Sequence, residues 1–370
     1  MREFLRRDLR VAVVPWILSR IIVVAALATA RFLHSDVSSL PRPIPLAQGL
    51  FAWDAGWYRA LAELGYTGNH ESALRFFPLL PALSRGLGFV FLGYEDVALI
   101  VIANLGALVL AALLYRLALV DTGDEAVAVR SAWLVLLLSP AVAFVLGYAE
   151  SLAMSLSVGA FLCIRSRRWA LAGVLALLAG LARPVGILLV LPLLVEAWST
   201  WSGTSVRERV ERVLAVVAPA VGMAIYLVYV GIRFGDPFEP LSVQNTATLR
   251  GGFVDPFSRV VRAIEATLDG GDRFGSGLHL FWAAVFGALL IVIWRTLPRS
   301  YFAYCALAWV LGLSASNLDS FERYCLSTFP FVLAVAVATR RRDVERTVFV
   351  LSSAGLFGYA LLAFFGSWVP

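Results

Sequence analysis

Apolar residues occupy most of the chain in long runs, and short polar stretches separate these runs. The runs cover approximately residues 11–31, 76–92, 97–119, 131–147, 149–164, 169–182, 184–199, 213–232, 279–297, 301–315, 324–339 and 347–367. A helix that crosses the hydrocarbon core of a bilayer needs about 20 apolar residues, so several runs are long enough and others are short or shared. The pattern predicts an all-α protein, a polytopic transmembrane helical bundle.

The arginines that lie between the runs set an expected orientation, because short cytoplasmic loops are enriched in basic residues. With the N-terminus in the cytoplasm and residues 76–92 not crossing, every short basic cluster falls inside. If residues 76–92 did cross, the clusters Arg165–Arg168, Arg207–Arg212 and Arg340–Arg346 would move outside. The full set of clusters is Arg2–Arg10, Arg116 and Arg130, Arg165–Arg168, Arg207–Arg212, Arg295 and Arg299, and Arg340–Arg346.

We therefore expect residues 76–92 to form a short external helix or a re-entrant piece, which Pro78 and Pro81 favour. This arrangement gives about 11 spans and places the C-terminus outside. It predicts one membrane-embedded domain over residues 1–370, with a cytoplasmic N-terminus (1–10), a first outer loop (32–96) and a long outer loop (233–278). In the long loop, Asp236-Pro237 and Asp255-Pro256 each predict the start of a surface helix.

The composition excludes several classes of protein. The chain has 370 residues, of which 60% are hydrophobic and only 15% charged, and no soluble domain of this size has that balance. All 31 basic residues are arginine and the net charge is +6, but the arginines are spread over short loops and form no nucleic-acid patch. The three cysteines lack metal spacing, and the chain has no phosphate loop, HExxH or nucleophile elbow.

The stretch Phe51–Tyr66 is the strongest candidate for chemistry in the first outer loop. Wound as a helix, it places a stripe of apolar residues on one face, as in a helix that lies in the headgroup layer. The stripe consists of Trp53, Trp57, Ala60, Leu61 and Leu64. Asp54 lies at the edge of this face, with Tyr58 one turn further. Asp54 is either a proton acceptor at the water–lipid boundary or the N-cap or first-turn acid of the helix.

Other charged residues fall where a membrane protein rarely tolerates them. Arg20 lies near the middle of the first run, where an arginine costs about 2.5–3.5 kcal/mol, so we expect it to face the bundle with a carboxylate or a polar cavity. Further charges occur at expected outer turns, namely Glu150, Arg183, Asp319, Glu322 and Arg323. Each alone is an ordinary interfacial charge, whereas the set, on the same side as Asp54, is typical of a functional cavity.

Six segments stand out, in order along the chain, namely WDAGWYRALAELGY (53–66), FFPLLPALSR (76–85), SPAVAFVLGYAESL (139–152), ARPVGILLVLPLLVEAW (182–198), FGDPFEPLSVQ (234–244) and ERYCLSTFPFVLAVA (322–336). Together they resemble the GPI mannosyltransferase 2 (PIG-V) family and its bacterial relatives. Val243-Gln244 departs slightly from an Ala-Gln of the family. The resemblance implies a membrane glycosyltransferase of the GT-C type in a bacterial plasma membrane, with its active site outside the cytoplasm.

The resemblance implies transfer of a sugar, most simply mannose, from a polyprenyl-phosphate donor to a lipid or glycan acceptor. The family's essential acid in the first outer loop matches Asp54, which would deprotonate the attacking hydroxyl in an inverting displacement. The leaving phosphate needs cations, for which the candidates are Arg183, Arg323 and Arg75. Candidates for positioning sugar or acceptor hydroxyls are Tyr58, Glu150 and Gln244.

The scheme requires no cofactor. Asp54 and Asp236 could bind a divalent metal, but their spacing does not demand one. The family's eukaryotic members use a GPI precursor as acceptor, and nothing in this chain extends that acceptor to it.

Two other classes of function remain open at the level of sequence. A transporter or flippase of lipid-linked substrates would also combine many spans with charges at membrane depth, although transporters often carry internal repeats and none is visible here. A non-catalytic membrane scaffold would tolerate replacement of Asp54. Transfer of sugar by membranes separates the enzyme from both.

Overall fold

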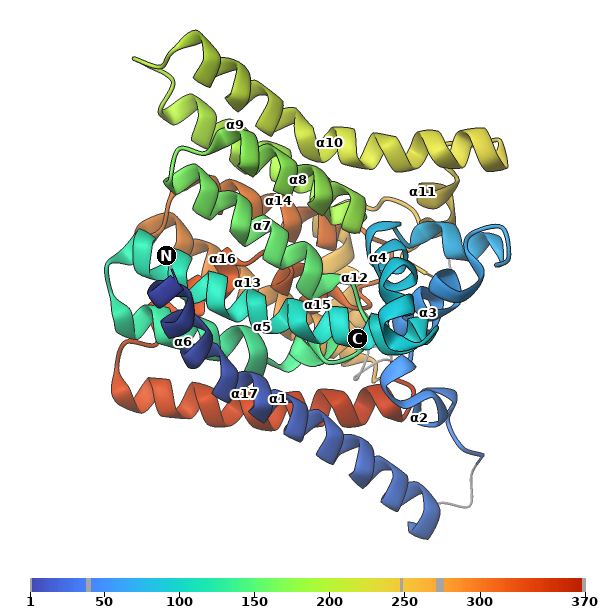
Figure 1. Cartoon of the computed structure of the whole chain (residues 1–370). Coiled ribbons are helices and arrows are strands. Elements are labelled where there is room, and N and C mark those ends of the chain that lie inside the picture. The colour runs from blue at the N-terminus through green and yellow to red at the C-terminus, as the bar shows by residue number, and fades with distance from the viewer. Residues whose placement is uncertain (1, 38–40, 247–248, 271–275, 368–370) are drawn as a thin grey trace. The chain divides into compact units, whose positions relative to one another are not determined.

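The structure, a computed structural model, describes residues 2–37, 41–246, 249–270 and 276–367, and the elements in these ranges are helices (Figure 1). The predicted all-α class is therefore confirmed for the described residues. The β-type pairing found among them is an isolated bridge between Phe253 and Ala315.

The chain folds as two units, with unit 1 made of residues 1–69, 80–155 and 335–370, and unit 2 of residues 70–79 and 156–334. In unit 1 lie α1 (Arg2–Val37), α2 (Ile44–Gln48), η1 (Gly49–Phe51), α3 (Asp54–Leu64), nearly all of α4 (Leu79–Gly88), η3 (Phe89–Phe91), α5 (Glu95–Thr122), α6 (Glu125–Leu137), η4 (Ser139–Phe144) and α17 (Arg342–Phe364). In unit 2 lie η2 (Glu71–Arg75), α8 (Trp169–Ala182), η5 (Pro184–Leu189), α9 (Val190–Ser199), α10 (Val206–Phe234), α11 (Glu239–Gln244), α12 (Pro256–Leu268), α13 (Ser276–Thr296), α14 (Arg299–Leu313) and α15 (Phe321–Leu326). The chain passes between the units after residue 69, after residue 79, within α7 (Glu150–Arg165) and within α16 (Pro330–Ala338).

Five of the described helices are long and apolar enough to cross a membrane, namely α1, α5, α10, α13 and α17. Shorter apolar helices accompany them, so the chain is an integral membrane protein, while the count of about 11 spans stays a prediction. The segment expected not to cross contains α4, which has 10 residues. At 1.5 Å per residue such a helix is about 15 Å long, half of the hydrocarbon thickness.

Two of the apolar runs are each divided between two elements at a proline. The run 131–147 contains the end of α6 and then η4, in which Pro140 lies in the first turn. The run 324–339 contains the end of α15 and then α16, which Pro330 opens. A proline has no backbone N–H and clashes with the preceding turn, so a new helical segment starts where hydropathy shows continuity.

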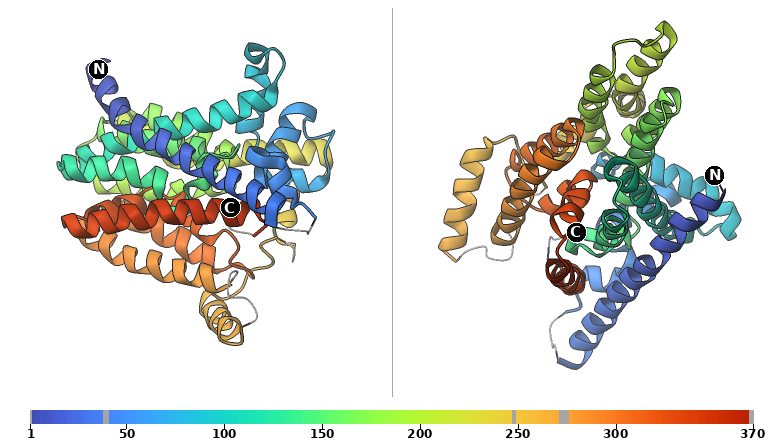
Figure 2. Two further views of the ribbon diagram at one scale, coloured as in Figure 1. Left: turned by 90° about the horizontal axis from the view of Figure 1, so that it is seen from below. Right: turned by 90° about the vertical axis from the view of Figure 1, so that its left-hand side faces the viewer.

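Unit 1 is organised around α1, which packs against α5, α6 and α17 (Figures 1 and 2). Arg20 faces this bundle as expected, and its hydrogen-bond partners are neutral. Its Nε donates to the Asn104 side chain at 2.9 Å, and one Nη donates to the Phe144 carbonyl at 2.7 Å. Of the two expected surroundings, a carboxylate or a polar environment, the described residues provide the polar environment.

The basic clusters of unit 1 gather at one end of its helices. The ion pairs that join them are Arg7–Glu125, Asp8–Arg116, Asp124–Arg340 and Arg130–Glu345. They link the start of α1, the α5–α6 turn and the start of α17. These are three of the loops expected on the cytoplasmic side, so their grouping agrees with the topology, while the orientation itself stays a prediction.

The basic clusters of unit 2 meet in the same way at the ends of α7, α9, α10 and α14. Glu196 accepts from Arg165 at 2.9 Å and from the Ser300 hydroxyl at 2.6 Å. Arg212 donates to the Ala197 carbonyl at 3.0 Å. Glu196 and Ala197, near the end of α9, therefore connect the end of α7, the start of α10 and the start of α14.

The two predicted helix starts in the long outer loop have different outcomes. Asp255 caps α12 as expected, because its side chain accepts from the Ser258 N–H at 2.7 Å, and that backbone hydrogen bond lowers the pKa of Asp255. Asp236 instead accepts from the Phe238 N–H, and α11 begins only at Glu239. The expected helix start at Asp236 is therefore too early in the chain, because Asp236 forms a turn that ends before α11 begins.

Small residues let α8 and α10 approach closely, and the two helices lie side by side in Figure 1. A Cβ added at Gly180 of α8 would lie 2.2 Å from the Pro219 carbonyl oxygen of α10. A Cβ added at Gly222 of α10 would lie 2.2 Å from the Leu177 carbonyl oxygen of α8. The backbones touch on both sides of the crossing, because glycine at these two positions leaves room for the facing carbonyl groups.

We expect Gly180→Ala and Gly222→Ala each to destabilise the protein, because either methyl group must push two backbones apart. Overpacking of this kind costs about 1–3 kcal/mol. Thermal unfolding of the detergent-solubilised chain measures the effect. Gly358→Ala on α17 is the matched control, since a Cβ there meets nothing within 4 Å and the alanine favours the helix. Equal melting temperatures for all three variants would contradict the proposed close crossing.

Candidate active site

Asp54 is the first residue of α3, which is shorter than the expected helix Phe51–Tyr66. The N-cap is Trp53, whose side chain makes no capping bond, so the N-cap alternative for Asp54 is wrong and the first-turn placement holds. The side of α3 that is buried in the protein contains Tyr58, which is 4% exposed, and Leu61 of the apolar stripe, whereas Leu64 of that stripe is 58% exposed. The placement of the stripe in the headgroup layer stays a prediction.

The residue before Asp54 has an uncommon backbone conformation. Trp53 has φ 59°, in a region that bulky residues rarely adopt. Its indole Nε1 donates to the Ala363 carbonyl at 2.9 Å, so the side chain is fixed to the end of α17. Strained residues persist only where surrounding contacts hold them, and they cluster at functional sites.

The turn before α7 lies beside Asp54 within unit 1. The Asp54 N–H donates to the Tyr148 hydroxyl at 3.3 Å, and the Gly147 N–H donates to the Leu50 carbonyl at 3.3 Å. Glu150 follows as the first residue of α7 and is 2% exposed. The structure thus brings three of the predicted residues, Asp54, Tyr58 and Glu150, into one unit, and it joins the segments of Asp54 and Glu150 by hydrogen bonds.

Arg183 lies in unit 2, directly after α8. The residue before a proline is restricted to extended backbone, and Pro184 therefore ends α8 at Ala182 and sets Arg183 at φ −157°. Arg183 is 6% exposed, and one of its Nη atoms donates to the Ser327 hydroxyl at 3.3 Å. Ser327 is the C-cap of α15, so this hydrogen bond places the Arg183 guanidinium at the end of that helix.

Arg323 lies on α15, which begins after another strained residue. Ser320, the N-cap of α15, has φ 59°. Arg323 is 5% exposed, and Tyr324 follows it on the helix. The Arg323 guanidinium carbon lies 5.3 Å from the centroid of the Tyr324 ring.

Arg250 reaches the same ring through a pairing of two loops. The loop after α11 runs beside the loop between α14 and α15, where the Val254 N–H donates to the Ser314 carbonyl at 2.9 Å. The Arg250 carbonyl accepts from the Ser316 hydroxyl at 3.0 Å and from the Asn317 N–H at 3.3 Å. These bonds fix the main chain of Arg250 and leave its side chain directed at Tyr324.

Three guanidinium groups therefore converge on one phenol ring in unit 2, and we call them the arginine cluster. The distances to the ring centroid are 5.7 Å for Arg183, 4.1 Å for Arg250 and 5.3 Å for Arg323. The Arg250 Nε is buried and makes no hydrogen bond to any of the described residues. Like charges gathered in buried surroundings repel one another, and an anionic ligand relieves that repulsion.

The other two predicted residues of unit 2, Gln244 and Arg75, end two elements that pack against each other, α11 and η2. The Gln244 carbonyl accepts from the Arg250 N–H at 3.2 Å, so Gln244 adjoins the loop that carries Arg250. Arg75 ends η2, which packs against α11, and its guanidinium carbon lies 4.7 Å from the Phe76 ring centroid. Arg75 thus stacks on its neighbour, while Arg183 and Arg323 share Tyr324.

Sequence reasoning missed Arg250 and Tyr324. Tyr324 follows Arg323 directly and could have been proposed as its platform, since arginine often stacks on aromatic rings. Arg250 gave no such signal, because it lies in a loop without periodicity and meets a segment 66 residues away. The described residues contain no group of three His, Cys, Asp or Glu side chains placed to hold a metal ion.

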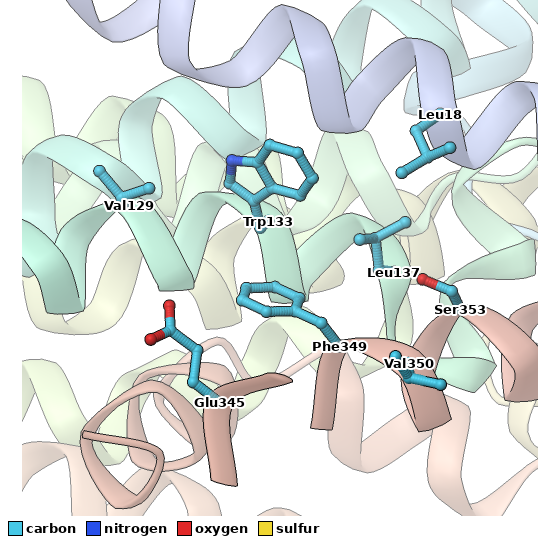
Figure 3. Close-up of a pocket in the computed structure, with 8 residues that line it drawn as sticks. All are labelled: Leu18, Val129, Trp133, Leu137, Glu345, Phe349, Val350 and Ser353. Atoms are coloured by element: carbon cyan, nitrogen blue, oxygen red, sulfur yellow. The ribbon is translucent and has the colours of Figure 1, made fainter. Parts of the chain in front are cut away.

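Unit 1 also contains an apolar cavity of about 650 Å³ between α1, α6 and α17 (Figure 3). It is lined by Leu18, Val129, Trp133, Leu137, Glu345, Phe349, Val350 and Ser353. Trp133 and Phe349 meet edge to face with their centroids 5.9 Å apart. The lining suits a hydrocarbon chain better than a sugar or a phosphate, and none of the predicted site residues lies there.

Neither a family model nor a curated protein matches the chain. Solved structures do. ArnT from Cupriavidus metallidurans, bound to undecaprenyl phosphate, superposes with TM-score 0.52 and 15% identity, over 90% of this chain and 62% of that one. The oligosaccharyltransferase AglB from Archaeoglobus fulgidus, in complex with an inhibitory peptide and a dolichol-phosphate, gives TM-score 0.47 and 12% identity, over 92% of this chain and 55% of that one.

The chain therefore spans between half and two thirds of the length of these structures. At such low identity the likeness to ArnT concerns the fold. The expected all-helical membrane bundle is confirmed for the described residues, and its fold is similar to that of ArnT.

Proposed function

We propose that the protein transfers a sugar from a polyprenyl-phosphate donor to a lipid or glycan acceptor outside the cytoplasm. The arginine cluster carries this proposal. It offers several guanidinium groups, mostly buried, to a single anionic group within a membrane protein. Planar guanidinium groups match the oxygens of a phosphate with paired hydrogen bonds.

A phosphate leaving group explains why the cations are needed. In an inverting displacement the acceptor hydroxyl attacks the anomeric carbon from the side opposite the phosphate. The bond from that carbon to the phosphate oxygen breaks, and negative charge grows on the lipid phosphate. Fixed cations stabilise developing charge most effectively where water is excluded, and Arg183 and Arg323 are each about 95% buried.

The fold supports a lipid-linked donor. ArnT, which has a similar fold, was solved with undecaprenyl phosphate bound. A polyprenyl-phosphate donor also needs no nucleotide-binding loop, and the sequence contains none. The sugar and the membrane follow only from the resemblance to the PIG-V family, which points to mannose and to a bacterial plasma membrane.

Asp54 is our candidate for the general base that takes the proton of the attacking hydroxyl. Its support is the family motif, its position at the start of α3 and the strained Trp53 that fixes it. Tyr58 and Glu150, in the same unit, are candidates for positioning hydroxyl groups. No step of this scheme requires a metal. A transporter or flippase, the alternative class, would bind the same lipid phosphate without transferring the sugar.

We expect Asp54→Asn to lower the transfer of radiolabelled mannose from polyprenyl-phosphate-mannose by about 10²- to 10⁴-fold, the usual contribution of a general base. Membranes that carry either form of the chain serve as the enzyme source. Glu63→Gln is the matched control, because Glu63 is an exposed acid on the same helix that pairs with Arg59 at 2.8 Å. Activity of Asp54→Asn within tenfold of wild type would remove Asp54 from the mechanism and leave the enzyme class intact. No transfer by wild type from this or another polyprenyl-phosphate sugar would favour the transporter.

We expect Arg250→Lys and Arg323→Lys each to raise the KM for the donor by about tenfold, although the charge is kept. Lysine is a point charge and cannot reproduce the paired hydrogen bonds of a guanidinium fork. Inhibition by undecaprenyl phosphate should weaken in parallel, which ties the defect to the phosphate. Arg262→Lys, at an exposed position on α12, is the control. Unchanged inhibition in both cluster variants would place the phosphate elsewhere.

A further inference from the structure

A buried acid and a buried histidine pair near the arginine cluster, and the scheme above uses neither. His279 lies on α13 and Glu322 on α15. The His279 Nδ1 lies 2.6 Å from the Glu322 Oε2, and the two side chains are 1% and 0% exposed. The His279 Nε2 faces Asp319 at 3.9 Å, and Asp319 is 39% exposed.

The pair leaves one acceptor unused. The second carboxylate oxygen of Glu322, Oε1, is buried and has no hydrogen-bond partner among the described residues. A buried polar atom without a partner destabilises the folded protein, and a charged one does so more strongly, so native proteins keep few of them. A ligand that donates a hydrogen bond to Oε1 would recover this free energy.

The pair adjoins the arginine cluster along the chain. Glu322, Arg323 and Tyr324 are consecutive on α15. The carboxylate therefore belongs to the residue that directly precedes one of the arginines of the cluster.

The chemistry of the pair defines the ligand that it fits. With the proton on Nδ1, His279 donates to Oε2 and fixes the carboxylate in one orientation. Oε1 is then an acceptor that complements a hydroxyl group. The described residues supply no third ligand for a metal ion, so a hydrogen-bonding role accounts for the pair. Because Oε1 is enclosed by protein atoms, neighbouring side chains must shift for a hydroxyl to reach it.

We propose that Glu322, oriented by His279, accepts a hydrogen bond from one hydroxyl of the donor's glycosyl group while the arginine cluster holds the phosphate. The inference rests on the proposed function, because that function places a sugar next to the phosphate. Glu322 would bind the sugar, and His279 would act as a positioning residue. The pair would thereby contribute to the choice of sugar.

A series of monodeoxy donors tests the proposal on the wild-type chain, without any variant. Polyprenyl-phosphate-mannose is compared with analogues that lack one ring hydroxyl at a time. A site built to bind a hydroxyl rejects the analogue that lacks it, because the buried acceptor is then left unpaired. We expect one analogue to lose about tenfold or more in kcat/KM. Equal kcat/KM for all analogues would overturn the proposal.

Variants then assign the loss to Glu322. Glu322→Gln should raise the KM for the full donor by about tenfold, with a smaller change in kcat, and should no longer discriminate against the sensitive analogue. His279→Asn keeps a donor near the position of Nδ1 and should retain more activity than His279→Leu. Glu265→Gln, at an exposed position on α12, is the control. A defect shared equally by all donors would show that the pair is only structural.

The outcomes separate this proposal from the function on which it rests. Transfer by wild type with no analogue-specific loss would sink the role of Glu322 and leave the glycosyltransferase standing. No transfer by wild type from any polyprenyl-phosphate sugar would overturn both. Melting temperatures of Glu322→Gln and wild type reveal any general loss of folding, and the analogue series on wild type remains decisive even then.

Discussion

The chain must satisfy its own polar groups, since lipid offers them no partner, and this constraint shapes the structure. Arg20 shows how this constraint is met: this cation on the first long helix donates hydrogen bonds to the side-chain amide oxygen of Asn104 and to main-chain carbonyls. The Ser151 and Ser155 hydroxyls likewise donate to carbonyls of α5, at 2.6 and 2.8 Å. Where such bonds and close glycine contacts are present, helices are fixed in register against one another.

Against this background, the exceptions are informative. Two of the buried atoms without a hydrogen-bond partner among the described residues, the Nε of Arg250 and the Oε1 of Glu322, lie in unit 2 near Tyr324. Two of the four non-glycine residues with positive φ in the described part of the chain adjoin candidate chemistry, Trp53 before Asp54 and Ser320 before α15. Proteins depart from local rules mainly at functional sites, which is why these features, more than any single motif, direct attention to the two regions.

Hydropathy predicted where nearly all the apolar helices lie, because a bilayer imposes a simple pattern on sequence. It did not predict where prolines divide a run, as at Pro140 and Pro330, since both parts are equally apolar. Motif and charge led to Asp54 and Arg323, but the side of α3 that is buried depends on α5 and could not be seen in one helix. Arg250 was invisible, because only the pairing of two distant loops brings it to Tyr324.

That loop pairing has a consequence for the history of such proteins. Arg250 is positioned by hydrogen bonds to its own carbonyl, and the neighbouring bond runs between the Val254 N–H and the Ser314 carbonyl. Most of the side chains in the two loops can drift over evolutionary time without disturbing main-chain bonds of this kind. Distantly related proteins could thus keep the spacing of the arginine side chains after the surrounding loop sequences have lost all recognisable similarity. Common ancestry would then be easier to trace through coordinates than through residue identity.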